Sequence, residues 1–341
     1  MRHQHGLSLI EVMIALVLGL IVVGAAGAIF ISNKRVYATT ESVARIQENT
    51  RVAFELMARD MREAGGLPCK RDPANFRSFV NQGEESAWWL QWFEGMHGYD
   101  GTVAGQPANR VAGTDMIEVG SAFTGDYFVS DKESNDTSAN LRLNKVEGIV
   151  EGEIVVVCDS QKTAMFQVTG VNDSIVALQH NSGASIVPGN CNKKFLFDGT
   201  RGSTSRCSNG GSGYLFPMGA QVVKVDSTRW FVGTNGRGGS SLYRQSLSKA
   251  NTAPDAAPTA AAAQEIAEGV ANLQIEYIEP TDVAYGNAAT VTNWSNVSAA
   301  RIILTMQVAQ GALAGREIQG TDNQVLGRQF SHIVSIRNHN P

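Results

Sequence analysis

Residues 6–11 read Gly-Leu-Ser-Leu-Ile-Glu, and an uncharged, mainly apolar run extends from Val12 to Ile31. About twenty helical residues rise about 30 Å, which is the thickness of one bilayer hydrocarbon core. A short basic stub, Met1–His5, precedes these residues. Glu11 therefore lies at the entrance of a segment long enough to span a membrane, where a charge toward the centre costs on the order of 3 kcal/mol. We expect this carboxylate to need a partner.

The order of these residues resembles the class III leader of type IV prepilins and of type II secretion pseudopilins. The resemblance implies that prepilin peptidase cuts between Gly6 and Leu7, that Leu7 is the N-methylated amino terminus, and that Glu11 acts in subunit assembly. Leaders of this family most often have Phe after the cut, and we interpret Leu7 as a sign of a minor pilin. Two alternatives stay open: an ordinary signal anchor with an incidental Glu11, or a secretory signal peptide cut near residues 25–28.

One long helix is predicted from residue 8 to about residue 63. Beyond the apolar run the pattern becomes amphipathic, with a stripe at three- and four-residue steps: Val43, Ile46, Thr50, Ala53, Met57 and Met61. The opposite face carries two acid-first pairs four residues apart, Glu41 with Arg45 and Glu55 with Arg59. Gly65, Gly66 and Pro68 then end the helix. We expect the stripe to pack on the protein's own sheet.

Composition and pattern indicate a β-rich domain after the helix. The chain has 341 residues, only 18% of them charged, and 35 glycines, which suits turns better than a helical bundle. The net charge is −4, and no basic patch favours nucleic acid as a partner. The organisation we predict is a leader (1–6), a transmembrane half-helix (7–32), an amphipathic half-helix (33–64) and a periplasmic domain (65–341). A low-complexity loop occupies residues 250–263 of that domain.

The β-rich part is expected to begin with an irregular segment, residues 69–112, that contains the aromatic cluster Trp88, Trp89, Trp92 and Phe93. The cluster is either a local core, which we favour, or an exposed interaction surface. Strands are predicted at residues 115–123, 140–143, 153–158, 164–171, 174–179, 221–225 with 229–232, 241–244, 273–277, 297–308 and 330–337. A short helical start is predicted at Ile266–Val270.

Four cysteines, Cys69, Cys158, Cys191 and Cys207, would lie outside the cytoplasm, where disulfides persist. They permit three pairings, among which the sequence cannot choose. We prefer Cys191–Cys207, which closes a short polar loop, and Cys69–Cys158, which ties the helix end to the β domain. A zinc site is the competing interpretation, but no C-x-x-C spacing and no nearby His support it.

No motif for catalysis or for a cofactor is recognisable. The chain lacks a G-x-S-x-G elbow, a G-x-x-x-x-G-K-[ST] phosphate loop and an H-E-x-x-H helix. One acidic stretch offers oxygen ligands but lacks the order of a twelve-residue calcium loop, and we interpret it as solvated: Asp126, Asp131, Glu133, Asn135 and Asp136. We therefore predict neither an enzyme nor a metal protein, and no cofactor.

The C-terminal sequence resembles the C-terminal half of PilW-type minor pilins and of J-type pseudopilins. The resemblance lies in Glu-Gly-Val-x-x-Leu-x-x-x-Tyr from Glu268, in Ala-Arg-Ile-Ile-Leu from Ala300, and in Val-Ser-Ile-Arg-Asn from Val334. It implies an α+β, pilin-like fold in which a long N-terminal helix packs on an antiparallel β-rich domain.

The resemblance also implies a function, a set of partners and a location. The protein would be a single-pass inner-membrane minor pilin that enters a type IV pilus and joins a tip complex that primes assembly. Its partners would be prepilin peptidase, other minor pilins, the major pilin, the assembly platform and a pilus-tip adhesin. The alternatives are a J-type pseudopilin of type II secretion and a pilin-anchored adhesive module that uses residues 69–260.

Overall fold

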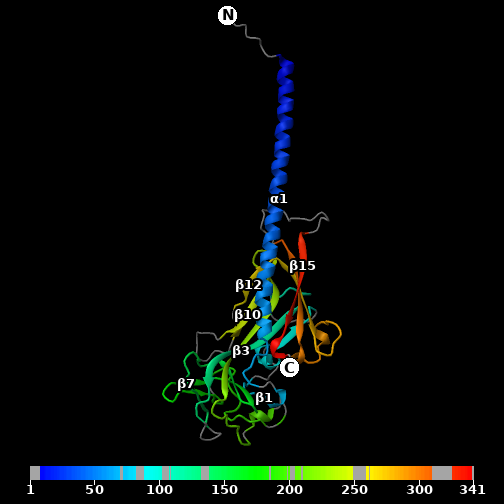
Figure 1. The fold of residues 1–341 in the computed structure, drawn as a ribbon. Coiled ribbons are helices and arrows are strands. Elements are labelled where there is room, and N and C mark those ends of the chain that lie inside the picture. The colour runs from blue at the N-terminus through cyan, green and yellow to red at the C-terminus, as the bar shows by residue number, and fades with distance from the viewer. Residues whose placement is uncertain are drawn as a thin grey trace.

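A computed structural model describes residues 8–69, 72–81, 88–101, 107, 109–131, 138–183, 186–197, 199, 204–208, 210–248, 259–260, 262–308 and 325–339. The fold is α+β. A single long helix, α1 (Leu9–Glu63), projects from an elongated β-rich domain, and the C-terminus lies beside the lower end of that helix (Figure 1). The helix bounds agree with the prediction from the sequence.

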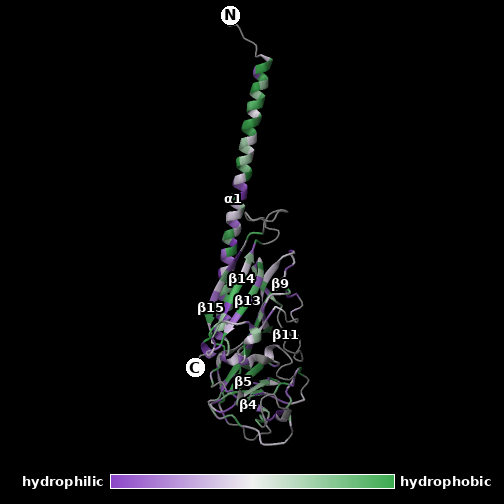
Figure 2. Ribbon diagram, turned by 90° about the vertical axis from the view of Figure 1, so that its right-hand side faces the viewer, coloured by the Kyte–Doolittle hydropathy of each residue, from purple (hydrophilic) through white to green (hydrophobic). Residues whose placement is uncertain are grey.

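Helix α1 has two halves that differ in their surroundings. The side chains from Leu9 to Tyr37 are all exposed, and the apolar ones give this half its hydrophobic surface (Figure 2). Contact with the domain begins at Ala38, and one face is buried from there on: Ala38, Ser42, Ile46, Thr50, Ala53, Met57, Ala58 and Met61. This face contains the predicted stripe except for Val43, which is half-buried. The amphipathic half therefore packs on the protein's own sheets, as expected.

The central sheet has nine strands. Along its main path β1 (Phe76–Ser78) pairs with β6 (Thr163–Gln167), followed by β5 (Ile154–Cys158), β9 (Gln221–Thr234), β10 (Ser240–Ser248) and β11 (Thr259–Ala260). Strand β12 (Gln264–Glu268) also pairs with β10, β3 (Met116–Phe128) pairs with β9, and β2 (Met96–Tyr99) pairs with β3. Every pairing is antiparallel except β1 with β6. The long strand β9 pairs with β5 near its start and with β10 near its end. It therefore joins the part of the domain that lies beyond the end of α1, which we call distal, to the part that lies beside α1, which we call helix-proximal (Figure 1).

Two smaller antiparallel sheets complete the domain. One has the order β13 (Val270–Ile278), β14 (Ala299–Gln307) and β15 (Gly327–Ser335), and it lies beside α1. Alternate residues of β14 are buried, which is the period expected of a strand with one face on a core. The other sheet has the order β4 (Asn140–Arg142), β8 (Ala177–Gln179) and β7 (Gly170–Asn172). Short 3-10 helices occur at Pro73–Asn75, Trp88–Glu94, Thr204–Cys207, Ala288–Thr290, Trp294–Asn296 and Arg337–His339.

The main core fills the space between α1, the β13–β15 sheet and one face of the central sheet. Two further cores lie on opposite faces of β5, because its side chains alternate. Val155 and Val157 join one core, and Ile154 and Val156 join the other. The predicted aromatic cluster belongs to the second of these, with Trp89, Trp92 and Phe93 buried, so the local-core interpretation is confirmed.

Several predicted elements differ from the observed ones. The predicted strand 164–171 is divided into β6 and β7, whereas 221–225 and 229–232 form the single strand β9. The helical start predicted at Ile266–Val270 is wrong, because residues 264–268 form β12 on the edge of β10 and Ala267 is buried there under α1. Gly269 then adopts a φ of 79° and turns the chain into β13. Most of the low-complexity loop 250–263 lies outside the described residues.

Candidate functional site

The first turn of α1 is closed by a capping box. The Ser8 Oγ accepts a hydrogen bond from the Glu11 N–H at 3.3 Å, and Glu11 Oε2 accepts one from the Ser8 N–H at 3.0 Å. The Glu11 carboxylate is thereby held at the helix N-terminus, where the helix dipole favours negative charge. It can accept further hydrogen bonds there. The predicted cleavage residues Gly6 and Leu7 lie outside the described residues.

The exposed half of α1 can span a membrane by its length and composition. Its most apolar 18-residue window has a mean hydropathy of 2.8, and none of that window is buried within the protein. Apolar surface of this extent is unfavourable in water. Bilayer lipid or other apolar helices can cover it, and a signal sequence would share these properties.

The outward face of the amphipathic half carries ion pairs along the helix. Arg45 pairs with Glu41 at 2.7 Å, as predicted. The predicted pair of Glu55 with Arg59 is wrong, because Glu55 pairs with Arg51 at 2.9 Å and Arg59 pairs with Glu63 at 3.4 Å. Both alternatives have four-residue spacing, so the sequence alone could not decide which partner each side chain takes.

A polar contact fastens the same helix to the central sheet. Asp60 Oδ2 accepts hydrogen bonds from Arg244 Nε at 2.8 Å and from Trp230 Nε1 at 2.9 Å. Arg244 Nη2 also reaches the Thr228 hydroxyl at 3.3 Å. This contact was not predicted from the sequence, although a carboxylate between the buried residues of the stripe is a signal that could have indicated it. The contact fixes where the helix lies on the sheet.

The two disulfides join Cys69 to Cys158 and Cys191 to Cys207. This is the pairing preferred from the sequence. The first connects the segment after α1 to the end of β5 across 89 residues of sequence, and the second closes a 16-residue separation. A groove of about 500 Å³ runs past the first disulfide, between Pro68 and Met218.

A row of polar side chains crosses the face of the central sheet that points away from α1. His97, Glu118, Arg229 and Gln245 occupy paired positions on β2, β3, β9 and β10, and we call them the polar row. Glu118 is 6% exposed and accepts a hydrogen bond from the Tyr99 hydroxyl at 3.0 Å. Burial raises the pKa of Glu118 to about 7, although the Tyr99 hydrogen bond and the charge of Arg229 oppose the shift.

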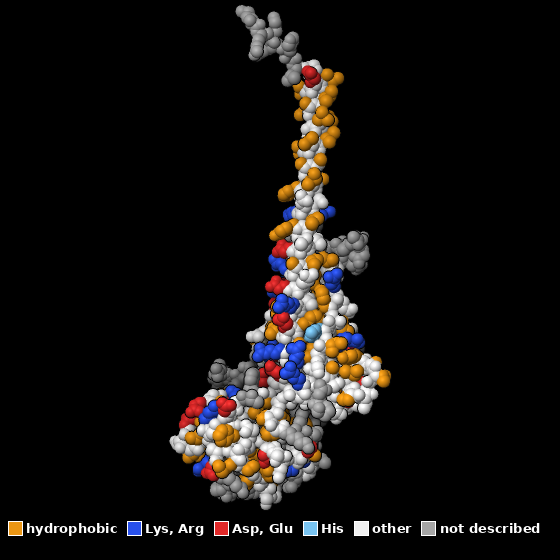
Figure 3. Space-filling model, in the orientation of Figure 1, with side chains coloured by type: hydrophobic (Ala, Val, Ile, Leu, Met, Phe, Trp, Pro, Cys, Tyr) orange, Lys and Arg blue, Asp and Glu red, His pale blue; other side chains and the backbone are white. Residues whose placement is uncertain are grey.

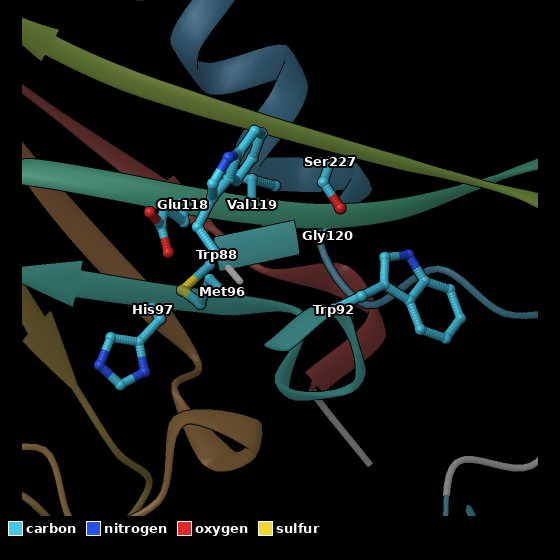
Figure 4. A pocket seen from close by; sticks show the side chains of 8 residues that line it. All are labelled: Trp88, Trp92, Met96, His97, Glu118, Val119, Gly120 and Ser227. Carbon is cyan, nitrogen blue, oxygen red and sulfur yellow. The ribbon is translucent and has the colours of Figure 1, made fainter. Parts of the chain in front are cut away.

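Arg229 is held by a hydrogen bond within the polar row and by an aromatic ring beside it. Its Nε donates to Gln245 Oε1 at 2.6 Å, and its guanidinium lies 5.0 Å from the ring centroid of Trp88. Figure 4 shows a cavity beside the row, lined by Glu118, His97 and the tryptophans Trp88 and Trp92. Its volume is about 10 Å³, which is about the space that one water molecule needs. The cavity has no room for a substrate, so we interpret the polar row as structural.

No group of three or more His, Cys, Asp or Glu side chains that could hold a metal ion occurs within the described ranges. Of the acidic stretch, Asp126 and Asp131 are exposed, whereas Glu133, Asn135 and Asp136 lie outside those ranges. The features that the structure brings together are thus a capped, apolar helix end and a helix face bound to a β-rich domain.

Comparisons with protein families agree with this geometry. Residues 1–27 match the family model of the prokaryotic N-terminal methylation motif. Such a leader motif on a long helix that packs on a β-rich domain is the layout of pilin-like proteins. Residues 229–338 match the family model of type IV pilus-assembly protein W. The two matches together support a PilW-type minor pilin of type IV pilus assembly.

These families point to a structural component of pilus assembly rather than to a known enzyme. The leader motif and the apolar helix also indicate membrane anchoring and association with a pilus. The chain has no significant match among the curated proteins or among the solved structures. Residues 28–228 lie between the two family matches, and the distal part of the domain is formed largely from them.

Proposed function

We propose that prepilin peptidase cleaves this chain after Gly6, and that the mature protein joins a tip complex of minor pilins that primes assembly of a type IV pilus. One observation carries this proposal. Helix α1, which begins within the leader match, packs on β12, β14, β15 and the terminal 3-10 helix Arg337–His339, all of which lie in or end at the match to pilus-assembly protein W. The helix that begins in the leader match thus continues, from Ala38 on, into the half that packs on the region matched to pilus-assembly protein W.

Before assembly the protein would be an inner-membrane protein with a single span and a periplasmic domain. The uncharged run from Val12 to Ile31 supports the span, and two disulfides suit the oxidising periplasm. Its partners would be the peptidase, the assembly platform, the major pilin, other minor pilins and a tip adhesin. The match to pilus-assembly protein W favours the pilus over a secretion pseudopilus.

Glu11 would govern assembly. In a bundle of apolar helices its carboxylate would meet the amino group of Leu7 in a neighbouring subunit, so that neither charge is buried without a partner. The capping box already holds the carboxylate at the end of the helix. A buried pair of this kind fixes the axial displacement of the helices more than it adds net stability.

The test uses the full chain in a piliated host. Mature protein from membranes should begin at Leu7, and replacing Gly6 with a bulky residue should leave the full-length form. A start beyond residue 25 would instead identify a secretory signal peptide. Glu11→Ala should be cleaved and membrane-resident but recruited poorly into sheared filaments.

The matched control for Glu11→Ala is Glu147→Ala, which removes an exposed carboxylate from the β-rich domain, away from the helix. This control should be recruited like the wild type. Normal recruitment of Glu11→Ala would show that Glu11 has no role in assembly.

A further inference from the structure

The outward face of the amphipathic half of α1 is strongly and regularly charged. At 100° per residue its acidic and basic side chains lie within about 120° of one another, opposite the buried stripe. Figure 3 shows acidic and basic side chains alternating down this side of the helix. They are open to solvent, with Arg51 80% and Glu55 64% exposed. Within the described part of the chain nothing packs over this face, so it is available to a partner.

The displacement between two assembled helices follows from the pairing proposed for Glu11. Leu7 and Glu11 are four residues apart. When the amino group of one subunit lies level with Glu11 of its neighbour, the two parallel helices are displaced by four residues, or about 6 Å. Each residue of one helix then lies level with the residue four positions further along in the other.

This displacement matches the charges of the outward face. Four exposed charges of one helix lie level with an opposite charge of the other: Glu41 with Arg45, Arg51 with Glu55, Glu55 with Arg59, and Arg59 with Glu63.

Other displacements match less well. Without displacement every charged residue of one helix lies level with the same residue of the other helix, and the two like charges repel. A displacement of seven residues gives two like pairs, Glu41 with Glu48 and Glu48 with Glu55, and one opposite pair, Glu55 with Arg62. One of three residues gives two opposite pairs, Arg45 with Glu48 and Glu48 with Arg51, but sets Arg59 against Arg62.

We infer that the outward face of α1 between Glu41 and Glu63 is a contact surface for a second, parallel copy of this helix, and that its charges select the four-residue displacement. This inference rests on the proposed function, because the displacement comes from the pairing of Glu11 with a neighbouring amino group. Exposed ion pairs are individually weak, so the face sets the register between helices rather than their affinity. The same side chains form ion pairs along their own helix, which holds them extended over the face.

Cross-linking in membranes tests the register. Two differently tagged copies of the full chain are expressed together, one with Glu41→Cys and the other with Arg45→Cys, and treated with a short bismaleimide. The native cysteines are all held in disulfides and do not react. The control combinations place cysteine at residue 41 of both copies, or at residues 41 and 48. The 41–45 product should exceed both controls about fivefold, and Glu11→Ala should reduce it to the control level.

A charge-swapped chain tests whether the charges cause this preference. It keeps every ion pair along the helix but reverses each one: Glu41→Arg, Arg45→Glu, Arg51→Glu, Glu55→Arg, Arg59→Glu and Glu63→Arg. Two swapped copies attract each other at the four-residue displacement, whereas a swapped and a wild-type copy repel at all four of these levels and attract each other only without displacement. In each experiment one copy carries Glu48→Cys and the other carries Val52→Cys, because these positions lie level at the four-residue displacement. A swapped copy with a wild-type copy should cross-link about fivefold less than two swapped copies or two wild-type copies.

The outcomes separate the inference from the proposed function. Equal cross-linking of matched and mixed combinations, or a 41–45 product no stronger than the controls, overturns the inference. Leader cleavage and recruitment into sheared filaments are measured in the same cells. Normal values there, with no preferred register, overturn the inference alone. A wild-type chain that is neither cleaved nor recruited overturns both.

Discussion

Asp60 of α1 and Arg244 of β10 form an ion pair across the interface between the helix and the central sheet, 184 residues apart in sequence. The pair is largely shielded from solvent, because the Asp60 side chain is 13% exposed and that of Arg244 is 26% exposed. Trp230, which is fully buried, donates its indole N–H to the same carboxylate. The helix thus meets the sheet at one defined position, whereas apolar contacts alone would tolerate some sliding.

Asp60→Ala should lower the free energy of unfolding by about 2–3 kcal/mol, because it leaves a shielded guanidinium and a buried indole N–H without their acceptor. Urea unfolding of the detergent-solubilised chain measures the loss. Asp126→Ala is the control, since its side chain is 96% exposed, and it should stay within about 0.5 kcal/mol of the wild type. Equal stability of the two variants would show that Asp60 does not fasten the helix.

Gly98→Ala should destabilise the contact between β2 and the β13–β15 sheet. A Cβ on Gly98 would overlap the Tyr277 hydroxyl and lie 2.9 Å from Trp294 Cη2. Both rings are rigid, so we expect a cost of about 1–3 kcal/mol in urea unfolding. Gly236→Ala adds the same methyl group where nothing lies within 4 Å, and its unfolding curve should overlay that of the wild type.

Removal of the Cys69–Cys158 disulfide should destabilise the protein more than removal of Cys191–Cys207. In the chain-entropy model, an 89-residue separation corresponds to about 4.5 kcal/mol and a 16-residue separation to about 3 kcal/mol. Thermal unfolding of the two double Cys→Ala variants ranks them. The opposite order would mean that local structure, rather than loop length, determines what each disulfide contributes.

Glu118 should make stability depend on pH. Its folded pKa of about 7 lies above its ordinary value of 4.5, because burial disfavours the charged form. Its stabilising contribution is therefore complete below about pH 4.5 and is lost as the pH rises through 7, a decrease of up to about 3 kcal/mol. Glu118→Gln removes this titration, so its free energy of unfolding should change less between pH 5 and 8. Glu147→Gln, at an exposed site, should retain the wild-type profile.

The sequence predicted features that depend on local pattern. The helix, its buried stripe and most strands follow from hydrophobic periodicity and from the glycines and prolines that interrupt it. The error at residues 266–270 has a tertiary cause, because Ala267 is compatible with a helix until the edge of β10 and the underside of α1 are both present. A single sequence contains no signal for that juxtaposition.

The candidate site was predicted unevenly for the same reason. Ser8 and Glu11 are only three residues apart, so their capping relationship could have been found from spacing, although no capping box was predicted for them. Asp60 and Arg244 are brought together only by the fold, as are Glu118 and Arg229 on adjacent strands. Their partners could not be assigned from sequence, although a carboxylate within an apolar segment signals that some partner exists.

The Cys69–Cys158 disulfide also determines how mechanical tension passes through the molecule. Cys69 follows shortly after the end of α1, and Cys158 ends β5 in the distal half of the domain. A pull on the distal half is therefore transmitted to the helix terminus through a covalent bond as well as through the hydrogen bonds between the intervening strands. The distal half can bear a load while the helix-proximal sheets keep their shape.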